Sequence, residues 1–254
     1  VVTIGGAFLL FAWRGPSLKT DGIFHPVSRE GGLILNNFIL TIAAASILLG
    51  TLYPLFIDVL ELGKVSVGAP YFESVFVPMM IPMIVVMGIA PFMKWKRGDF
   101  TKATNKLKAV GVISLIIGCF VWLVVDRSSA LSSLGIALSI WLFLATFIEL
   151  ASRIKLFQVP LMDSVRSIMR QPRASWGMTF AHMGLAIAVA GITASSTWKV
   201  ESIQVMKFGD QVTVAGYTYT LNDVKKVQGP NYIATRGVFN VKKGASFNIT
   251  LEPE

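Results

Sequence analysis

The chain has 254 residues, of which 54% are hydrophobic and only 15% charged, and its formal net charge is +9. Soluble domains are about one quarter charged and spread their apolar residues in periodic patches, so this composition excludes an ordinary soluble protein and indicates an integral membrane protein. The excess of Lys and Arg is typical of the cytoplasmic loops of such a protein, which explains the charge better than nucleic-acid binding does.

Six apolar runs are predicted to form membrane helices, because backbone groups in lipid must find hydrogen-bond partners within their own helix. The first run lacks the pattern of a signal peptide and is interpreted as the last part of a helix that begins upstream. The runs are Val1–Trp13, Leu33–Val59, Val75–Met93, Ala109–Val125, Leu134–Phe157 and Trp176–Trp198.

The loops between these runs alternate in their content of basic residues, so that a loop rich in Lys and Arg is followed by a loop poor in them. The poor loops, Asp58–Ser74 and Asp126–Ser133, carry one basic residue each, whereas the rich loops are Arg14–Glu30, Lys94–Lys108 and Arg153–Arg173. Because Lys and Arg are retained on the cytoplasmic side, the rich loops are predicted to be cytoplasmic and everything after residue 198 to be extracytoplasmic.

The segment Leu62–Ser74 is dense in glycine, proline and aromatic residues. It is interpreted as an ordered loop that packs on the outer membrane surface, with Tyr71 and Phe72 facing apolar surface. There it is expected to lie beside the β-rich domain predicted below for residues 199–254. A simpler interpretation is that the two rings are anchors at the membrane–water interface.

After Trp198 the sequence changes to period-two alternation between turns of Gly, Asn, Asp and Pro, which is typical of an antiparallel meander. Residues 1–198 are therefore predicted to form a transmembrane bundle and residues 199–254 a β-rich domain. The fold class is a polytopic α-helical membrane protein with a C-terminal antiparallel β-rich extracytoplasmic domain. The strand-like segments are Glu201–Phe208, Gln211–Ala215, Tyr217–Val227, Tyr232–Val241 and Ser246–Leu251.

His182 is the candidate functional residue of the last apolar run. An ionisable side chain within a membrane helix is costly to bury and is functional by default. Ala181 and Gly184 beside it leave room for another helix or for a flat ligand. Residue type alone leaves two interpretations open, a neutral imidazole bonded to a neighbouring helix or an axial ligand of haem iron.

Other polar residues are interpreted as structural. His25 lies in a polar loop and is expected to be solvated. Cys119, the only cysteine, excludes an internal disulfide and a multi-cysteine metal site, and is expected to be a small buried apolar residue. Glu149 and Arg153 are spaced for an ion pair near the cytoplasmic end of a helix.

Five short strings resemble segments of CcmF, the large subunit of the bacterial System I cytochrome c haem lyase. Each string is weak alone, but five in the family's order, followed by a β domain after the last helix, are specific. The strings are Pro26–Asn37, Gly50–Pro54, Ser66–Glu73, Ala181–Gly184 and Gly229–Tyr232.

The resemblance implies an enzyme of the bacterial inner membrane that attaches haem to the Cys-X-X-Cys-His motif of apocytochrome c on the periplasmic side. It implies haem delivery by the chaperone CcmE, cooperation with CcmH, and a b haem held between two transmembrane histidines. His182 matches the second of these by its Ala-His-Met-Gly setting. A quinol is implied as electron donor, although no residue here identifies its site.

The same resemblance places the first haem-ligating histidine, a Trp-rich haem-handling segment and two external histidines upstream of Val1. The chain by itself is therefore expected to be inactive in ligation, and no residue of it is assigned as catalytic. Two alternatives stay open: a haem transporter, against which the few buried charges count, and a structural scaffold whose β domain docks assembly partners. The related proteins of nitrite reductase assembly are not separated from CcmF by these residues.

Overall fold

The computed structural model describes residues 2–18, 25–125, 130–244 and 247–254. Parts of two predicted loops, at 19–24 and 126–129, and Ser246 of the last predicted strand lie outside the described residues. The chain separates into two compact units, Val1–Thr193 and Ala194–Glu254. The predicted domain limit after residue 198 stays a prediction.

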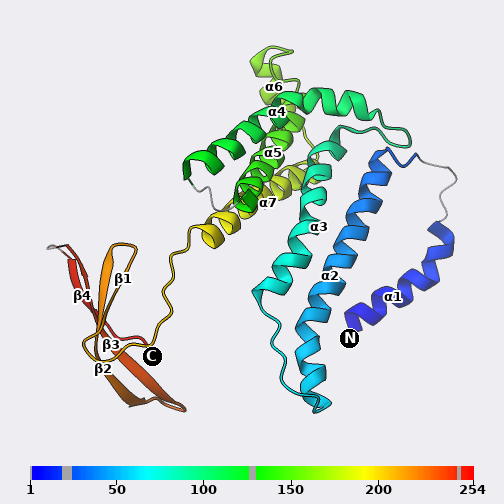
Figure 1. Cartoon of the computed structure of the whole chain (residues 1–254). Helices are drawn as coiled ribbons and strands as arrows, with labels where there is room; N and C mark the ends of the chain where they lie inside the picture. The colour runs from blue at the N-terminus through cyan, green and yellow to red at the C-terminus, as the bar shows by residue number, and fades with distance from the viewer. Residues whose placement is uncertain (1, 19–24, 126–129, 245–246) are drawn as a thin grey trace. The chain divides into compact units, whose positions relative to one another are not determined.

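Five of the described helices are long and apolar enough to cross a membrane, namely α2, α3, α4, α5 and α7. The segment α1 is helical, as predicted, but its 13 residues are too few for a span. Short 3₁₀ segments, Gly15–Leu18 and Ala90–Phe92, follow α1 and α3, and a π-helical turn, Val121–Val125, extends α4. The helices are α1 (Val2–Arg14), α2 (Arg29–Val59), α3 (Ala69–Ile89), α4 (Phe100–Phe120), α5 (Ala130–Arg153), α6 (Leu161–Met169) and α7 (Arg173–Thr197) (Figure 1).

Helices α2 and α4 begin earlier than the apolar runs predict, because their polar first turns are capped. Ser28 Oγ accepts the Gly31 N–H at 3.1 Å at the start of α2. Asp99 Oδ1 accepts the Lys102 N–H at 3.0 Å at the start of α4, and this hydrogen bond holds the pKa of the Asp99 carboxyl below its ordinary value. The second half of the predicted Lys94–Lys108 loop is therefore helical.

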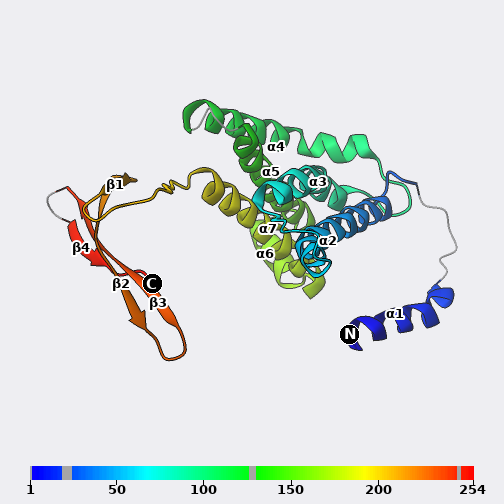
Figure 2. The same cartoon turned by 60° about the horizontal axis from the view of Figure 1, so that its bottom comes forward.

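The prediction of a loop over Leu62–Ser74 is wrong for its C-terminal part, because α3 already begins at Ala69 after the N-cap Gly68. Tyr71 and Phe72 lie in the first turn of α3 and are half-buried. The Tyr71 hydroxyl donates to the Ser46 carbonyl of α2 at 3.0 Å. The aromatic rings therefore hold α3 against α2, and the two helices lie side by side in Figures 1 and 2.

Two loops rich in Lys and Arg are joined by a set of hydrogen bonds, here called the clasp, between residues 25–30 and 94–98. Glu30 strengthens it, because its Oε2 accepts the Lys96 N–H at 2.8 Å. Since α2 and α3 separate the two segments, the clasp places both loops on the same side of the membrane. Its backbone hydrogen bonds, of 2.8–3.1 Å, run from the N–H groups of His25, Arg29 and Gly98 to the carbonyls of Lys96, Lys94 and Val27.

Buried side chains join the membrane-spanning helices in two clusters. The first consists of Ile89, Ala103, Leu107, Val110 and Ala145, and the second of Ile84, Leu138, Leu142 and Ala186. Small residues allow the close approach that this packing needs. A Cβ on Gly118 of α4 would lie 2.9 Å from the Ala137 Cβ of α5, and one on Gly88 would lie 2.5 Å from Trp141 Nε1.

The second unit is an antiparallel meander in the order β1-β2-β3-β4, which confirms the predicted arrangement (Figure 2). Leu221 of β2 is opposite Phe239, and Val241 of β3 is opposite Ile249. Only Leu221 and Val241 are buried among the described residues of this sheet. The predicted strand Glu201–Phe208 is absent. The strands are β1 (Gln211–Val214), β2 (Tyr217–Gln228), β3 (Ile233–Lys243) and β4 (Phe247–Leu251).

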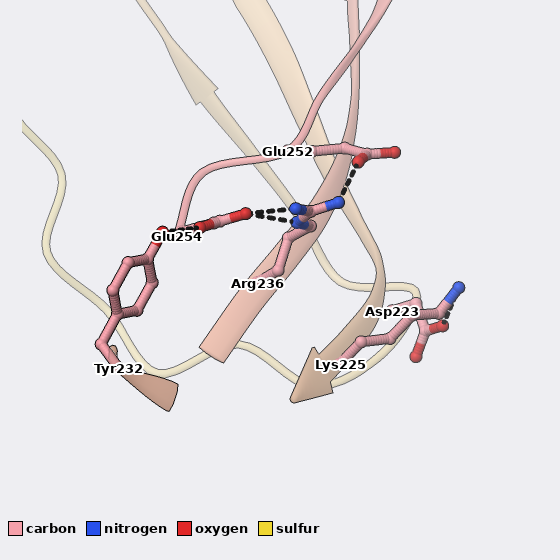
Figure 3. A network of polar contacts seen from close by, with 6 residues as sticks. All are labelled: Asp223, Lys225, Tyr232, Arg236, Glu252 and Glu254. Atoms are coloured by element: carbon pink, nitrogen blue, oxygen red, sulfur yellow. Dashed lines mark hydrogen bonds and ion pairs between the residues drawn. The ribbon is translucent and has the colours of Figure 1, made fainter. Parts of the chain in front are cut away.

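Arg236 of β3 ties the segment after β4 to the sheet (Figure 3). Its Nε donates to Glu254 Oε1 at 2.8 Å, and its Nη1 lies 3.2 Å from Glu252 Oε2. The hydrogen bond to Glu254 raises the pKa of the Arg236 guanidinium above its ordinary value. The Gly237 N–H adds a bond of 2.9 Å to the Pro253 carbonyl, so the segment continues the edge of the sheet.

The α2–α3 contact predicts the effect of one added methyl group. A Cβ on Gly50 would lie 2.3 Å from Tyr71 Cε1, and the ring cannot move away without losing its bond to Ser46. Gly50→Ala is therefore expected to destabilise the protein by about 1–3 kcal/mol, as overpacking does. Gly6→Ala in α1 is the control, because nothing lies within 4 Å of the added atom. Thermal unfolding in detergent measures both, and an unchanged Gly50→Ala midpoint would contradict the packing.

Candidate functional site

His182 lies in the first half of α7 and is half-buried. The chain has two histidines, and His182 is the one within a membrane-spanning helix. No hydrogen bond to its imidazole is present in the described part of the chain. The half-buried sulfur residues Met178 and Met183 flank it on the same helix.

Helix α7 contacts α5 on the C-terminal side of this histidine. Ser139 Oγ of α5 donates to the Ala186 carbonyl at 2.7 Å. Toward the C-terminal end of α7, a Cβ on Gly135 would lie 2.5 Å from Thr193 Oγ1, so the Thr193 side chain lies directly over Gly135. Glu149 lies toward the C-terminal end of α5, and its carboxylate is near enough to interact electrostatically with His182.

Glu149 forms the predicted ion pair with Arg153. Arg153 Nε donates to Glu149 Oε1 at 3.1 Å, and a second, closer contact joins Nη2 to Oε2. The two side chains are only 14% and 18% exposed, so the pair is far more buried than a pair reaching for the membrane surface. The remaining nitrogen, Arg153 Nη1, is buried without a hydrogen-bond partner in the described residues.

A face of small residues runs along α7, and at about 100° per residue His182 is offset from it by about 140°. Its members recur at intervals of three and four residues and are exposed within this chain. A Cβ added at any of the three glycines would meet nothing within 4 Å, so open space lies over this face. A flat ligand or another helix fits there. The face consists of Gly177, Ala181, Gly184, Ala188 and Gly191.

This arrangement fits haem better than a multi-ligand metal site. The described residues contain no group of three or more His, Cys, Asp or Glu side chains that could hold an ion. What they offer is one imidazole without a hydrogen-bond partner and, on α5, one buried guanidinium nitrogen without a partner. An imidazole binds haem iron, and a buried guanidinium suits a carboxylate such as a haem propionate.

The other residues that the sequence singled out have structural positions. His25 lies in the clasp, where its Nδ1 accepts the Val27 N–H at 3.1 Å, so it remains a loop residue far along the chain from His182. The prediction that Cys119 is buried is wrong. Cys119 is exposed on an apolar face of α4 together with Leu115 and Phe120, because that face has no protein neighbour in the described chain.

The proximity of Glu149 to His182 was not predicted from the sequence. The sequence did contain a signal, because charged side chains inside an apolar run are costly to bury and indicate an interaction within the bundle. The i, i+4 spacing predicted the pair itself, whereas its position opposite α7 depends on how two distant helices pack.

Comparisons with known proteins agree on one family. Residues 197–254 match the family model described as the CcmF C-terminal beta-sandwich. The chain is 40% identical over 240 residues to the cytochrome c-type biogenesis protein CycK of Bradyrhizobium diazoefficiens, covering 94% of this chain and 36% of that protein. It is 36% identical over 242 residues to the cytochrome c-type biogenesis protein CcmF of Escherichia coli, with the same two coverages. The chain belongs to the CcmF family.

The solved structure of a protein named cytochrome c heme lyase CcmF has the same fold, with a TM-score of 0.61 over 90% of this chain and 35% of that one, at 23% identity. The chain thus spans just over a third of the length of these CcmF relatives. These relatives are named for cytochrome c-type biogenesis, and the comparisons confirm the resemblance seen in the five strings.

The structure gives some of those CcmF-like strings a physical role. Pro26–Asn37 contains most of the first half of the clasp and the cap of α2. Gly50–Pro54 and Ser66–Glu73 meet where Gly50 faces the Tyr71 ring. These strings mark packing contacts, whereas Ala181–Gly184 surrounds the candidate ligand.

The Glu149–Arg153 pair predicts a non-additive response to mutation. Arg153→Met should destabilise the protein by about 3–5 kcal/mol, because a carboxylate then stays buried without a partner. The double variant Glu149→Gln with Arg153→Met should lose much less, since no charge is left unpaired. Unfolding in detergent, followed by tryptophan fluorescence, measures both. Equal losses in the two variants would mean that the pair is screened by water and contributes nothing.

Proposed function

We propose that this chain supplies one axial ligand, His182, of a membrane-embedded b haem in a cytochrome c haem lyase. In that enzyme haem is attached covalently to apocytochrome c on the periplasmic side of the bacterial inner membrane. The proposal rests on one observation above all: the half-buried imidazole of a membrane-spanning helix, α7, has no hydrogen-bond partner in the described chain.

The chemistry of the neighbouring residues supports the same ligand. His182 would hold the haem iron through a nitrogen of its imidazole ring. Arg153 Nη1 offers a buried donor for a propionate. When bound, haem supplies one-electron redox chemistry, and the protein positions it and tunes its potential.

The depth of His182 favours electron transfer over ligation as the role of this haem. The residue lies six positions past Trp176, or roughly 9 Å along the helix axis. If the basic loops are cytoplasmic, the haem iron lies in the cytoplasmic half of the bundle. That position is distant from the periplasmic side, where thioether bonds form, and suits a relay that keeps the transferred haem reduced.

The partners proposed for this system are the haem chaperone CcmE, CcmH, apocytochrome c and a quinol that supplies electrons. They follow from family membership, and no described residue of this chain is assigned to any of them. The second axial histidine is expected in the longer protein. A scaffold function for the β-rich unit is the alternative, and it differs in predicting no haem bound through His182.

The haem assignment is tested in purified full-length protein. His182→Ala should abolish or greatly weaken the b-haem absorption bands, because an axial ligand is lost. His25→Ala should leave them intact, since His25 is held in the clasp. Added imidazole should partly restore haem in the His182→Ala protein. An unchanged spectrum in that variant would leave His182 as a packing residue.

The orientation of the chain is tested separately with matched cysteine substitutions. Lys102→Cys in α4 and Lys226→Cys in β2 both replace exposed lysines. In a background that lacks Cys119 and other native cysteines, an impermeant thiol reagent should label position 226 from the periplasm and position 102 only from the cytoplasm. Labelling of both from one side would overturn the proposed topology.

A further inference from the structure

Helix α6 has an inverted pattern of burial. Its serine side faces the helical unit, since Ser164 is 1% exposed and Ser167 is half-buried. Most of its large apolar side chains point away from the protein, and Ile168, next to the serines, is half-buried. Met162 is 71% exposed and Met169 is 84% exposed, and Leu161 and Val165 are exposed beside them. A helix in water would be expected to bury its apolar side and expose its serines.

The spacing of these residues divides α6 into three faces. At about 100° per residue, Leu161, Met162, Val165 and Met169 fall within one sector of roughly 100°. Ser164 and Ser167 occupy a second sector, and the charged residues Asp163, Arg166 and Arg170 occupy the third. A helix lying flat beside a membrane-spanning bundle meets three such surroundings: protein, lipid and water.

The position of α6 in the chain brings it close to the membrane. It lies between α5, which ends at Arg153, and α7, which begins at Arg173, and both are long and apolar enough to span (Figure 1). Because α7 begins only a few residues after Met169, the Cα atoms of Met169 and Arg173 are at most about 14 Å apart. The exposed apolar face is therefore within reach of the interface that α7 enters.

Charge favours anionic lipid as the partner of this helix. Between residues 154 and 172 the only acidic residue is Asp163, and it lies 3.7 Å from Arg166. Lys155, Arg170 and Arg173 are exposed, and no ion pair is present for them in the described residues. Basic residues flanking an apolar helix face attract anionic headgroups, and each contributes separately.

We propose that α6 is an interfacial helix whose apolar face, Leu161, Met162, Val165 and Met169, inserts into the membrane surface while the flanking arginines bind anionic phospholipid headgroups. The helix anchors the connection between α5 and α7 to the bilayer. The proposal depends on the membrane-spanning character of these two helices and is independent of haem binding.

The test uses the full-length protein in nanodiscs, in a background that lacks Cys119 and other native cysteines, with the fluorophore NBD attached to one introduced cysteine at a time. Met162→Cys and Met169→Cys report on the apolar face, and Asp163→Cys and Arg170→Cys are matched controls on the charged face. NBD at 162 and 169 should emit at shorter wavelength and be quenched by nitroxide-labelled lipid. At 163 and 170 it should emit as in water and be quenched little.

Three results would overturn the insertion. Water-like emission at 162 and 169 would mean that α6 stands clear of the bilayer. Blue-shifted emission without quenching by lipid would mean that protein covers the face. Equal quenching at all four positions would mean that the helix is embedded without orientation.

The lipid preference is measured at Met162→Cys with nitroxide-labelled phosphatidylglycerol and phosphatidylcholine at equal mole fraction. Stronger quenching by phosphatidylglycerol is expected, and it should fall to equality when Arg166, Arg170 and Arg173 are all replaced by Gln. Equal quenching by the two lipids in the protein with its native arginines would overturn the headgroup assignment.

Discussion

The hydrocarbon core of a membrane offers no hydrogen bonds, so the polar groups of a spanning helix must be satisfied by protein. Here Ser114 and Thr146 donate to carbonyls one turn back on their own helices, at 2.8 and 2.7 Å, and Ser139 donates across to Ala186. Against this pattern the His182 imidazole stands apart, because it has no hydrogen-bond partner in the described chain. A half-buried base of this kind suits a ligand, whereas a packing residue would be expected to find a donor or acceptor.

The charges within the bundle are arranged so that they can remain there. Glu149 and Arg153 together are neutral, and a paired dipole in a poorly solvated site costs far less than either charge alone. The pair keeps one guanidinium nitrogen, Arg153 Nη1, without a hydrogen-bond partner among the described residues.

The sequence predicted the elements better than their contacts. Long apolar runs identify spans because lipid imposes a length and a composition, and period-two alternation with turn residues identified the meander. The start of α3 was misplaced because Ala69 and Pro70 resemble a loop, although proline is favoured in the first turn of a helix. Cys119 was expected to be buried, but hydropathy does not distinguish a lipid-facing from a protein-facing position. The approach of Glu149 to His182 depends on helix packing that no local pattern encodes.

The clasp has a consequence for how the protein enters the membrane. Its two halves, residues 25–30 and 94–98, are separated in sequence by two complete spans, and its hydrogen bonds join them once both spans are in place. During synthesis the first half of the clasp stays without its hydrogen-bond partners until the ribosome has produced Gly98. From then on α2 and α3 form a hairpin whose two free ends are joined by the clasp. This hairpin is complete before α4 leaves the ribosome. Helix insertion can thus proceed by pairs, with the first pair locked as a unit on which the later helices assemble.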